Sequence, residues 1–227
     1  MPQIALKGKV VVITGSSLGI GRETAFKFAR EGCRLAITYY KDKEEGVKTS
    51  KECLALGASD CILLQLNVKD DKSIKNAVKK IADKFGKIDI LVNNAGVVAW
   101  KRLEKQSDEE IDSQIDTNLR GLIKTTKYCL PYVKETIINI ASGAGLNGFA
   151  TLTTYCATKF GVRGFTQALA EELQGIKVFS VNPGMTATRM TNFKGVAPEK
   201  VAEVVLNTAK GIYKVKSGGD VNVWEHV

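Results

Sequence analysis

Tyr155 and Lys159 are the two side chains of this sequence whose types and spacing best suit proton transfer. They lie four residues apart in a strong helical pattern, so both project from one face of a helix. A tyrosine with a reference pKa near 10 is a poor proton shuttle at neutral pH, but a nearby ammonium group favours the phenolate and lowers that pKa. The pair predicts acid–base chemistry, although a tyrosine and a lysine at this spacing also occur on ordinary helix surfaces.

A glycine-rich turn, Thr14-Gly15-Ser16-Ser17-Leu18-Gly19-Ile20-Gly21, follows the first apolar run of the chain. Glycines in such a turn permit positive φ, let the backbone approach a pyrophosphate and expose helix N-terminal amides that attract anions. The spacing G-x-x-x-G-x-G differs from the common G-x-G-x-x-G. The turn predicts dinucleotide binding, and the alternative is a tight strand-to-helix connection without a ligand.

The same turn contains G-x-S-x-G, the pattern around the nucleophile of α/β-hydrolases, with Ser17 in the nucleophile position. A serine hydrolase needs a histidine, and the single histidine of this chain is His226, the penultimate residue. Chain ends tend to be poorly ordered. A serine hydrolase is therefore the weaker interpretation of the turn.

Short apolar runs rich in valine and isoleucine alternate with helical patterns from end to end, and they predict the elements that position these residues. The expected strands are 9–14, 34–39, 61–66, 88–92, 136–141, 177–181 and 220–224, and the expected helices are 19–31, 43–56, 71–85, 108–133, 153–173 and 198–213. Strands buried on both faces read as continuous apolar runs, so we expect an α/β fold with a doubly wound parallel sheet, a Rossmann fold of about seven strands with helices on both faces. Ligands bind beyond the carboxyl ends of such strands.

Composition limits the class of protein. The chain has 227 residues, 44% of them hydrophobic and 25% charged, which predicts one globular domain over residues 1–227. The lysines behind its net charge of +9 are scattered along the chain, so we expect a solvated basic surface and neither a nucleic-acid nor a membrane partner. No apolar run approaches the roughly 20 residues of a membrane span, and the N-terminus lacks the apolar core of a signal peptide.

The five cysteines are odd in number and form no C-x-x-C. This pattern predicts neither a disulfide framework nor a zinc or other metal site. Free thiols fit a reducing compartment, so we expect a cytoplasmic protein.

Further motifs follow the glycine turn in a fixed order: NNAG at Asn93 to Gly96, Asn118, Ser142, YCATK at Tyr155 to Lys159 and NPGMTAT at Asn182 to Thr188. Together the six motifs resemble the short-chain dehydrogenase/reductase family, whose pattern includes TGxxxGxG, NNAG, a helix asparagine, a serine, YxxxK and a PG turn. The resemblance covers essentially the whole chain, and ordered motifs are far more specific than any single one. It implies an oxidoreductase that transfers hydride between NAD(P)(H) and a carbonyl or secondary alcohol.

The resemblance implies a proton relay of four residues. Tyr155 would be the general acid/base, and Lys159 would lower its pKa and hold the nicotinamide ribose. Ser142 would hydrogen-bond the substrate oxygen, and Asn118 would support a water that extends the relay from Lys159. Alternatively, Ser142 caps a turn and Asn118 is an ordinary polar helix residue.

The family pattern also implies a row of cofactor contacts. The expected cofactor-binding residues are Gly15, Ser17, Gly19, Ile20, Gly21, Tyr39, Lys41, Asn67, Val68, Asn94, Ala95, Gly96, Tyr155, Lys159, Pro183, Gly184, Thr186 and Thr188. Asn67 stands where the family commonly has an aspartate near the adenine, so the hydrogen-bonding capacity remains and the charge is lost.

The end of the second strand bears on the choice between NAD and NADP. Tyr39 stands about where an aspartate would hold both ribose hydroxyls of NAD, and Lys41 and Lys43 follow it. Basic residues welcome a 2′-phosphate, so we expect NADP, with NAD as the alternative. The two lysines could instead merely solvate the start of a helix whose N-cap is Asp42.

Apolar residues near the expected site suggest the substrate. Candidates are Val98, Trp100, Phe149, Leu152, Met185, Met190 and Phe193. They indicate a small hydrophobic or uncharged carbonyl compound or alcohol, although several could be core or interface residues. The sequence leaves open a 3-oxoacyl-[acyl-carrier-protein] reductase, a sugar or polyol dehydrogenase and a general carbonyl reductase. The chain also ends without the glycine-rich tail of many family members, which suggests a compact version of the fold.

Partners follow from the same resemblance. We expect a homodimer or homotetramer through helices 108–133 and 153–173, whose apolar residues can pair. An acidic acyl-carrier partner would suit the basic surface. A catalytically silent NADP-binding sensor is an alternative to the enzyme, but the intact set of Ser142, Tyr155 and Lys159 argues against it.

Overall fold

A parallel sheet of seven strands forms the centre of the computed structural model, which describes residues 4–227. Residues 1–3 of the expected domain lie outside the described residues. The strands are β1 (Val10–Ile13), β2 (Arg34–Tyr39), β3 (Asp60–Gln65), β4 (Ile88–Asn93), β5 (Val133–Ile140), β6 (Lys177–Asn182) and β7 (Asp220–Asn222). Their order in the sheet is β3-β2-β1-β4-β5-β6-β7, and every neighbouring pair is parallel.

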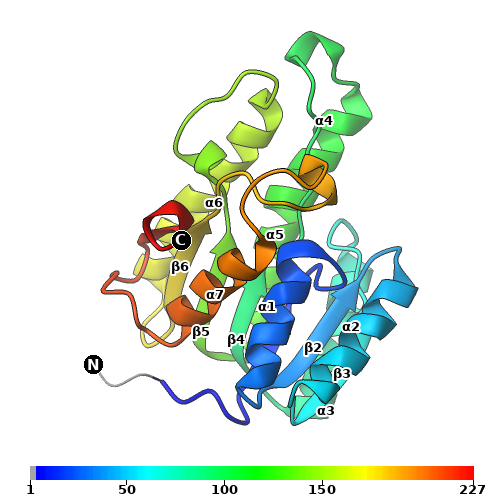
Figure 1. Cartoon of the computed structure of the whole chain (residues 1–227), viewed down its shortest axis with the longest axis vertical. Coiled ribbons are helices and arrows are strands. Elements are labelled where there is room, and N and C mark those ends of the chain that lie inside the picture. The colour runs from blue at the N-terminus through cyan, green and yellow to red at the C-terminus, as the bar shows by residue number, and fades with distance from the viewer. Residues whose placement is uncertain (1–3) are drawn as a thin grey trace.

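Helices cover both faces of the sheet (Figure 1). They are α1 (Gly19–Arg30), α2 (Lys43–Ala55), α3 (Asp71–Phe85), α4 (Asp108–Ile115), α5 (Gly121–Cys129), α6 (Thr153–Glu172) and α7 (Pro198–Ala209). The layer of α1, α2 and α7 packs on one face, and α3, α5 and α6 pack on the other. The expected doubly wound α/β fold is confirmed.

Alternation along the strands builds one core on each face. Val11 and Ile13 of β1 point into the core beneath α1, whereas Val10 and Val12 point into the core beneath α3 and α6. Successive side chains of a strand face opposite ways, so a strand buried on both faces is apolar throughout. All four residues of β1 are almost fully buried.

The expected helix 108–133 is wrong as a single element. It is divided into α4, a π-helical segment η2 (Asp116–Arg120) and α5, and β5 already begins at Val133. A Cβ atom on Gly121 would lie 2.8 Å from the carbonyl oxygens of both Asp116 and Val68. The wider turn thus brings the helix backbone against the connection after β3, and apolar periodicity gave no sign of this interruption.

Two further boundaries differ from the expectation. Helix α7 ends at Ala209 and not at Tyr213, because Gly211 adopts a left-handed conformation with φ of 69°. Strand β7 ends at Asn222, and the chain continues as the short 3-10 helix η5 (Val223–Glu225).

Three long connections rise above the carboxyl end of the sheet and carry the candidate site. They join β4 to α4, β5 to α6 and β6 to α7, in the upper half of Figure 1. Short helices lie within them, namely η1 (Leu103–Lys105), η3 (Gly143–Gly145) and η4 (Arg189–Thr191). Within residues 4–227, none of the helices combines the length and apolar character needed to span a membrane.

Candidate functional site

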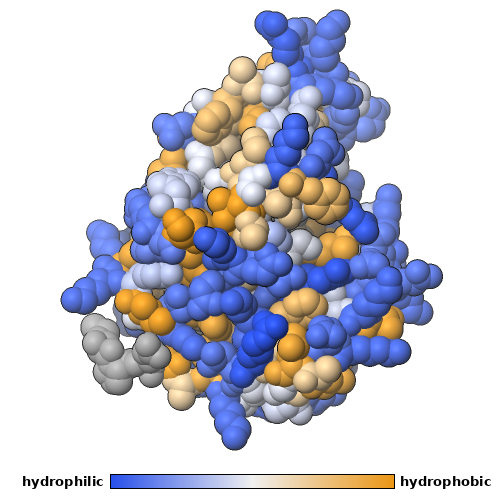
Figure 2. All heavy atoms as spheres, in the orientation of Figure 1, coloured by the Kyte–Doolittle hydropathy of each residue, from blue (hydrophilic) through white to orange (hydrophobic). Residues whose placement is uncertain are grey.

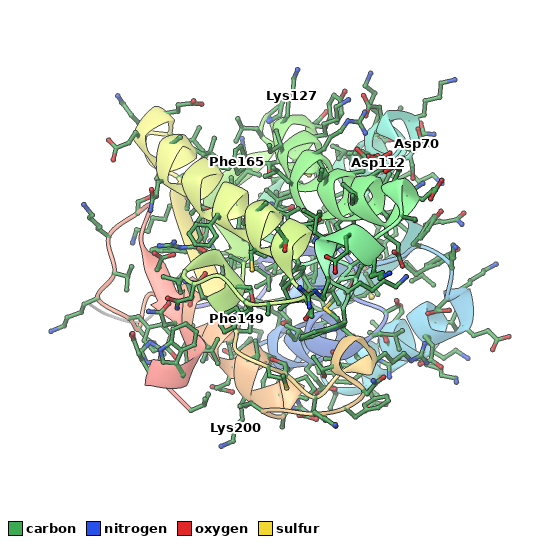
Figure 3. The ribbon with its side chains drawn as sticks, turned by 90° about the horizontal axis from the view of Figure 1, so that it is seen from above. Asp70, Asp112, Lys127, Phe149, Phe165 and Lys200 are labelled. Atoms are coloured by element: carbon green, nitrogen blue, oxygen red, sulfur yellow. The ribbon has the colours of Figure 1, made fainter. Side chains whose placement is uncertain are left out.

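A cleft with a volume of about 1410 Å³ opens where the strands end. Small-molecule pockets are typically about 300–1,000 Å³, so this cleft has room for a dinucleotide beside a second molecule. In Figure 2, apolar side chains gather in the upper half of the molecule, over the connection after β5 and over η4. Seen from above in Figure 3, Phe149 lies between α6 and the segment that contains η4 and α7.

The glycine turn has the shape that a pyrophosphate requires. Gly15 and Gly19 have φ of 64° and 56°, in the region that favours glycine. A Cβ atom on Gly15 would lie 3.1 Å from the Cα of Ala95, and one on Gly21 would lie 2.4 Å from the carbonyl oxygen of Gly15. Helix α1 begins at Gly19 without a side-chain N-cap, so its first amides are free to donate hydrogen bonds to an anion.

Hydrogen bonds fasten this turn to the NNAG segment. The Thr14 hydroxyl accepts from the amides of Asn94 at 2.9 Å and Ala95 at 3.0 Å. The Asn94 side-chain amide donates to the carbonyls of Thr14 at 2.9 Å and Gly15 at 3.1 Å. The Asn94 side chain therefore shapes the nucleotide turn, while Ala95 and Gly96 line the cleft beside it.

Most of the residues expected to bind a cofactor line the cleft: Gly15, Ser17, Gly19, Ile20, Lys41, Asn67, Val68, Asn94, Ala95, Gly96, Tyr155, Lys159, Pro183, Gly184, Thr186 and Thr188. Gly21 lies beneath the turn, and Tyr39 does not line the cleft. Tyr39 shares the face of β2 with Leu35 and Ile37, and a Cβ atom on Gly46 of α2 would lie 3.1 Å from its ring. Strand alternation thus turns Tyr39 toward α2, and Tyr40 lines the cleft instead.

Three of the four expected catalytic residues meet in the cleft. Ser142, Tyr155 and Lys159 line it, and the Lys159 ammonium lies 5.5 Å from the centre of the Tyr155 ring. The Lys159 Nζ donates to the carbonyl of Ile140 at 2.8 Å. Helix α6 places Tyr155 and Lys159 on one face, as their spacing predicted.

Asn118 lies behind these three and is only 1% exposed. Its side chain accepts from the amide of Val97 at 2.8 Å and donates to the carbonyl of Val97 at 2.8 Å. It also donates to the Thr158 hydroxyl at 3.2 Å, and that hydroxyl donates to the carbonyl of Tyr155 at 2.7 Å. Asn118 therefore joins Val97, which directly follows the NNAG segment, to α6 and is absent from the cleft wall.

Burial controls the ionisation of the central pair. Desolvation raises the pKa of Tyr155 to about 12, and a hydrogen bond with Ser142 opposes this shift. Desolvation lowers the pKa of Lys159 to about 8. Desolvation is the largest cause of both shifts, and the expectation that Lys159 lowers the pKa of Tyr155 stays a prediction. The raised pKa keeps Tyr155 protonated at neutral pH, which a proton donor requires, and it also makes the phenol a weaker acid.

Charged residues that the sequence did not reveal line the cleft beside the second strand. The Arg22 guanidinium donates to the carbonyl of Ser17 at 2.6 Å and pairs with Glu45 of α2. Hydrogen bonds from Lys48 and Arg22 lower the pKa of Glu45 to about 2. Only the folded chain brings α1 and α2 together here, so no local motif marks this pair.

Asp42 is the N-cap residue of α2, as the alternative interpretation stated, but its side chain makes no capping hydrogen bond. Its carboxylate lies 3.4 Å from the guanidinium of Arg189, which belongs to η4. Lys41 lines the cleft, whereas Lys43 does not and is the first residue of α2. Of the two lysines expected near a 2′-phosphate, Lys41 alone faces the cleft.

All seven candidate substrate residues, Val98, Trp100, Phe149, Leu152, Met185, Met190 and Phe193, line the cleft. Phe149, Met185 and Phe193 are 51%, 54% and 70% exposed. The Trp100 indole donates to the carbonyl of Met190 at 3.0 Å, which ties the connection after β4 to η4. This end of the cleft is apolar and accessible.

The serine hydrolase interpretation finds no support in this geometry. His226 stacks on Tyr213, with 4.0 Å between the ring centres, and is not part of the cleft wall. Ser17 lines the cleft without this histidine beside it. The G-x-S-x-G pattern here is part of the nucleotide turn.

Comparison with known proteins agrees with the site. The model of the family described as short chain dehydrogenase matches residues 9–197. The 3-oxoacyl-[acyl-carrier-protein] reductase FabG of Thermotoga maritima is 39% identical over 209 residues, which cover 89% of this chain and 82% of that protein. The FabG protein of Staphylococcus aureus is 38% identical over 190 residues, which cover 81% and 77%.

Solved structures show the same architecture. A dehydrogenase/reductase from Sinorhizobium meliloti superposes with a TM-score of 0.90 at 26% identity, over 97% of this chain and 95% of that chain. A short chain dehydrogenase from Burkholderia cenocepacia, in complex with NADP, has a TM-score of 0.89 at 29% identity, over 96% and 97%. Sequence, site geometry and fold together show that this chain belongs to the short-chain dehydrogenase family.

Proposed function

We propose that this protein is an NADPH-dependent carbonyl reductase that acts on 3-oxoacyl thioesters. The observation that carries the proposal is the meeting of Ser142, Tyr155 and Lys159 between a glycine turn and an apolar end of one cleft. The turn fits a dinucleotide, because the positive φ of Gly15 and Gly19 and the uncapped first amides of α1 present backbone donors to an anion. The relatives named above support the thioester as substrate.

The chain's own residues supply the proton and hold the substrate. Ser142 lies close enough to Tyr155 to affect its pKa, and both side chains line the cleft, so both can bind one carbonyl oxygen. Tyr155 donates its proton to that oxygen as negative charge develops there, and Ser142 stabilises the same charge. The Lys159 ammonium lies beside the Tyr155 ring and would hold the nicotinamide ribose hydroxyls. A bound nicotinamide dinucleotide supplies the hydride.

The cleft wall and a solved relative support NADP over NAD as the cofactor. Lys41 lines the cleft near Tyr40, and β2 ends on Tyr39 where an aspartate would select NAD. The Burkholderia cenocepacia relative was solved in complex with NADP. Against NADP stand the carboxylates of Asp42 and Glu45, which also line the cleft, but they pair with the guanidinium groups of Arg189 and Arg22.

The first experiment compares NADPH and NADH oxidation with an acetoacetyl thioester, aldehydes, diketones and sugars. We expect NADPH and the thioester to give the highest kcat/KM. Tyr155→Phe removes the proton donor and should lower kcat by about 10²- to 10⁴-fold, with nucleotide affinity retained. Tight nucleotide binding without any turnover would favour a silent sensor, and an active Tyr155→Phe enzyme would contradict the mechanism.

We also infer the state in which this enzyme works. Residues 1–227 act as one domain, because β1 and β7, near opposite ends of the chain, belong to one sheet.

A homodimer or homotetramer is supported by exposed apolar residues on α4, α5 and α6. The five cysteines are free thiols, which supports a reducing, cytoplasmic location.

A further inference from the structure

A polar network joins α6 to β7 behind the wall of the cleft. The Arg163 Nε donates to the Oδ1 of Asp220 at 2.9 Å, and its Nη2 donates to the Oδ2 at 2.5 Å. The two side chains are only 18% and 22% exposed. A bidentate ion pair of this kind fixes the orientation of the two side chains as well as their distance, so α6 and β7 are held in one relative position.

The same network reaches two connections that line the cleft. The remaining Nη1 of Arg163 donates to the carbonyl of Gly145 at 2.7 Å, in the segment η3 after β5. The side-chain amide of Asn182 donates to the Oδ1 of Asp220 at 3.0 Å, and Asn182 directly precedes the PG turn after β6. One ion pair therefore contacts α6 and both connections.

Gly145 transmits this contact to Ser142. The amide of Gly145 donates to the carbonyl of Ser142 at 2.8 Å, and the amide of Gly143 donates to the carbonyl of Pro183 at 2.8 Å. A Cβ atom on Gly145 would lie 2.7 Å from the carbonyl oxygen of Lys159. The turn that carries Ser142 is thus packed on the α6 backbone at Lys159, one helical turn before Arg163.

We propose that Arg163 and Asp220 are positioning residues that hold Ser142 against Tyr155 and Lys159. Neither of them lines the cleft, so they act through the Gly145 turn and not on the substrate. The proposal rests on the proposed reductase function. Loss of the Asp220 charge would release the Arg163 guanidinium and let the Gly145 carbonyl move, and Ser142 would move with it.

The kinetic test is the Asp220→Asn variant, which keeps the shape of the side chain. Because misplacement of a reacting group by about 1 Å can cost 10²-fold in rate, we expect single-turnover reduction of an acetoacetyl thioester to slow by about tenfold or more. Nucleotide affinity should change by less than about threefold, since the glycine turn is untouched. Asp220→Glu, which keeps the charge, should recover part of the rate.

The matched control is Glu31→Gln. The Lys210–Glu31 pair is similarly buried, at 17% and 31% exposure, and joins the ends of α7 and α1 outside the cleft. Glu31→Gln should lower the melting temperature, as we also expect for Asp220→Asn, and it should leave the rate of thioester reduction unchanged. A wild-type rate in Asp220→Asn, or equal slowing in Glu31→Gln, overturns the proposal.

A double-mutant cycle tests whether the effect passes through Ser142. In a Ser142→Ala background, Asp220→Asn should cause little further slowing, because the group that it positions is already gone. If the double variant were slowed by the product of the two single-variant factors, Asp220 would act elsewhere than through Ser142.

Amide hydrogen exchange provides a readout that needs no substrate. The amides of Gly145 and Leu146 should exchange faster in Asp220→Asn than in the wild type or in Glu31→Gln. Unchanged exchange at Gly145 overturns the positioning role by itself. If the wild type reduced no carbonyl compound while these amides responded as expected, the proposed function would fail and the structural link would stand.

Discussion

The ionisation of individual side chains in this cleft depends on burial as well as on the charges of their neighbours in the sequence. Lys159 was expected to act as a cation that favours the phenolate of Tyr155. Desolvation lowers the pKa of Lys159 to about 8 and raises that of Tyr155 to about 12, and the effect of Lys159 on Tyr155 stays a prediction. The residue types were readable from the sequence, but the balance of charge and solvent depends on the folded cleft.

This ionisation makes nucleotide binding depend on pH. Below about pH 8 the Lys159 amine is protonated and can donate to ribose hydroxyls; above that pH it loses its charge. We therefore expect NADPH affinity to fall as the pH rises through about 8, and calorimetric titrations between about pH 7 and 10 would measure it. Lys159→Met should bind more weakly and without this step. A step that persists in Lys159→Met would assign the titration to another group.

The sequence predicted those residues of the site that belong to local motifs. The glycine turn, Ser142, Tyr155 and Lys159 fall where the motifs indicated. Arg22 and Arg189 also reach the cleft, but their partners Glu45 and Asp42 lie far away in the sequence. Contacts of this kind arise only from tertiary packing.

At the scale of elements, sequence patterns located the strands and helices well and failed where the backbone departs from regular periodicity. The π-helical segment with Asn118 interrupts a helix whose apolar pattern continues across it. Tyr39 and Tyr40 are adjacent at the end of β2, and a shift of one residue moves a side chain to the opposite face. The strand was predicted correctly, but the residue that faces the cleft was not.

The junction of β1 and α1 should tolerate no side chain at Gly21. A Cβ atom there would lie 2.4 Å from a backbone oxygen and 2.5 Å from the side-chain nitrogen of Asn94. Overpacking of this kind costs about 1–3 kcal/mol, so Gly21→Ala should lower the midpoint of denaturant unfolding and weaken NADPH binding.

Gly164→Ala is the control for that substitution. Gly164 is exposed on α6, and an added Cβ atom would meet nothing within 4 Å. Alanine is favoured over glycine within a helix by about 0.5–1 kcal/mol, so this variant should be more stable than the wild type. Equal destabilisation by both substitutions would show that the crowding at Gly21 is not the cause.

At the scale of the whole molecule, one face, formed by α4, α5 and α6, carries apolar side chains that are exposed to solvent. Ile115, Ile123 and Phe160, on α4, α5 and α6, are 42%, 37% and 45% exposed. Ile115 and Ile123 are eight residues apart and bracket the partly buried Leu119, which packs with α6. Apolar side chains clustered on adjoining helices are typical of an interface between two copies of a chain.

A charge on this face should therefore separate the subunits. We expect light scattering to give the mass of a dimer or tetramer for the wild type and a lower mass for Ile123→Asp, because an unpaired carboxylate at an apolar interface is costly. Leu54→Asp is the control, since Leu54 is 50% exposed on α2, away from this face. A monomeric wild type would contradict the interface, and a mass lowered equally by Leu54→Asp would place the contact on another surface.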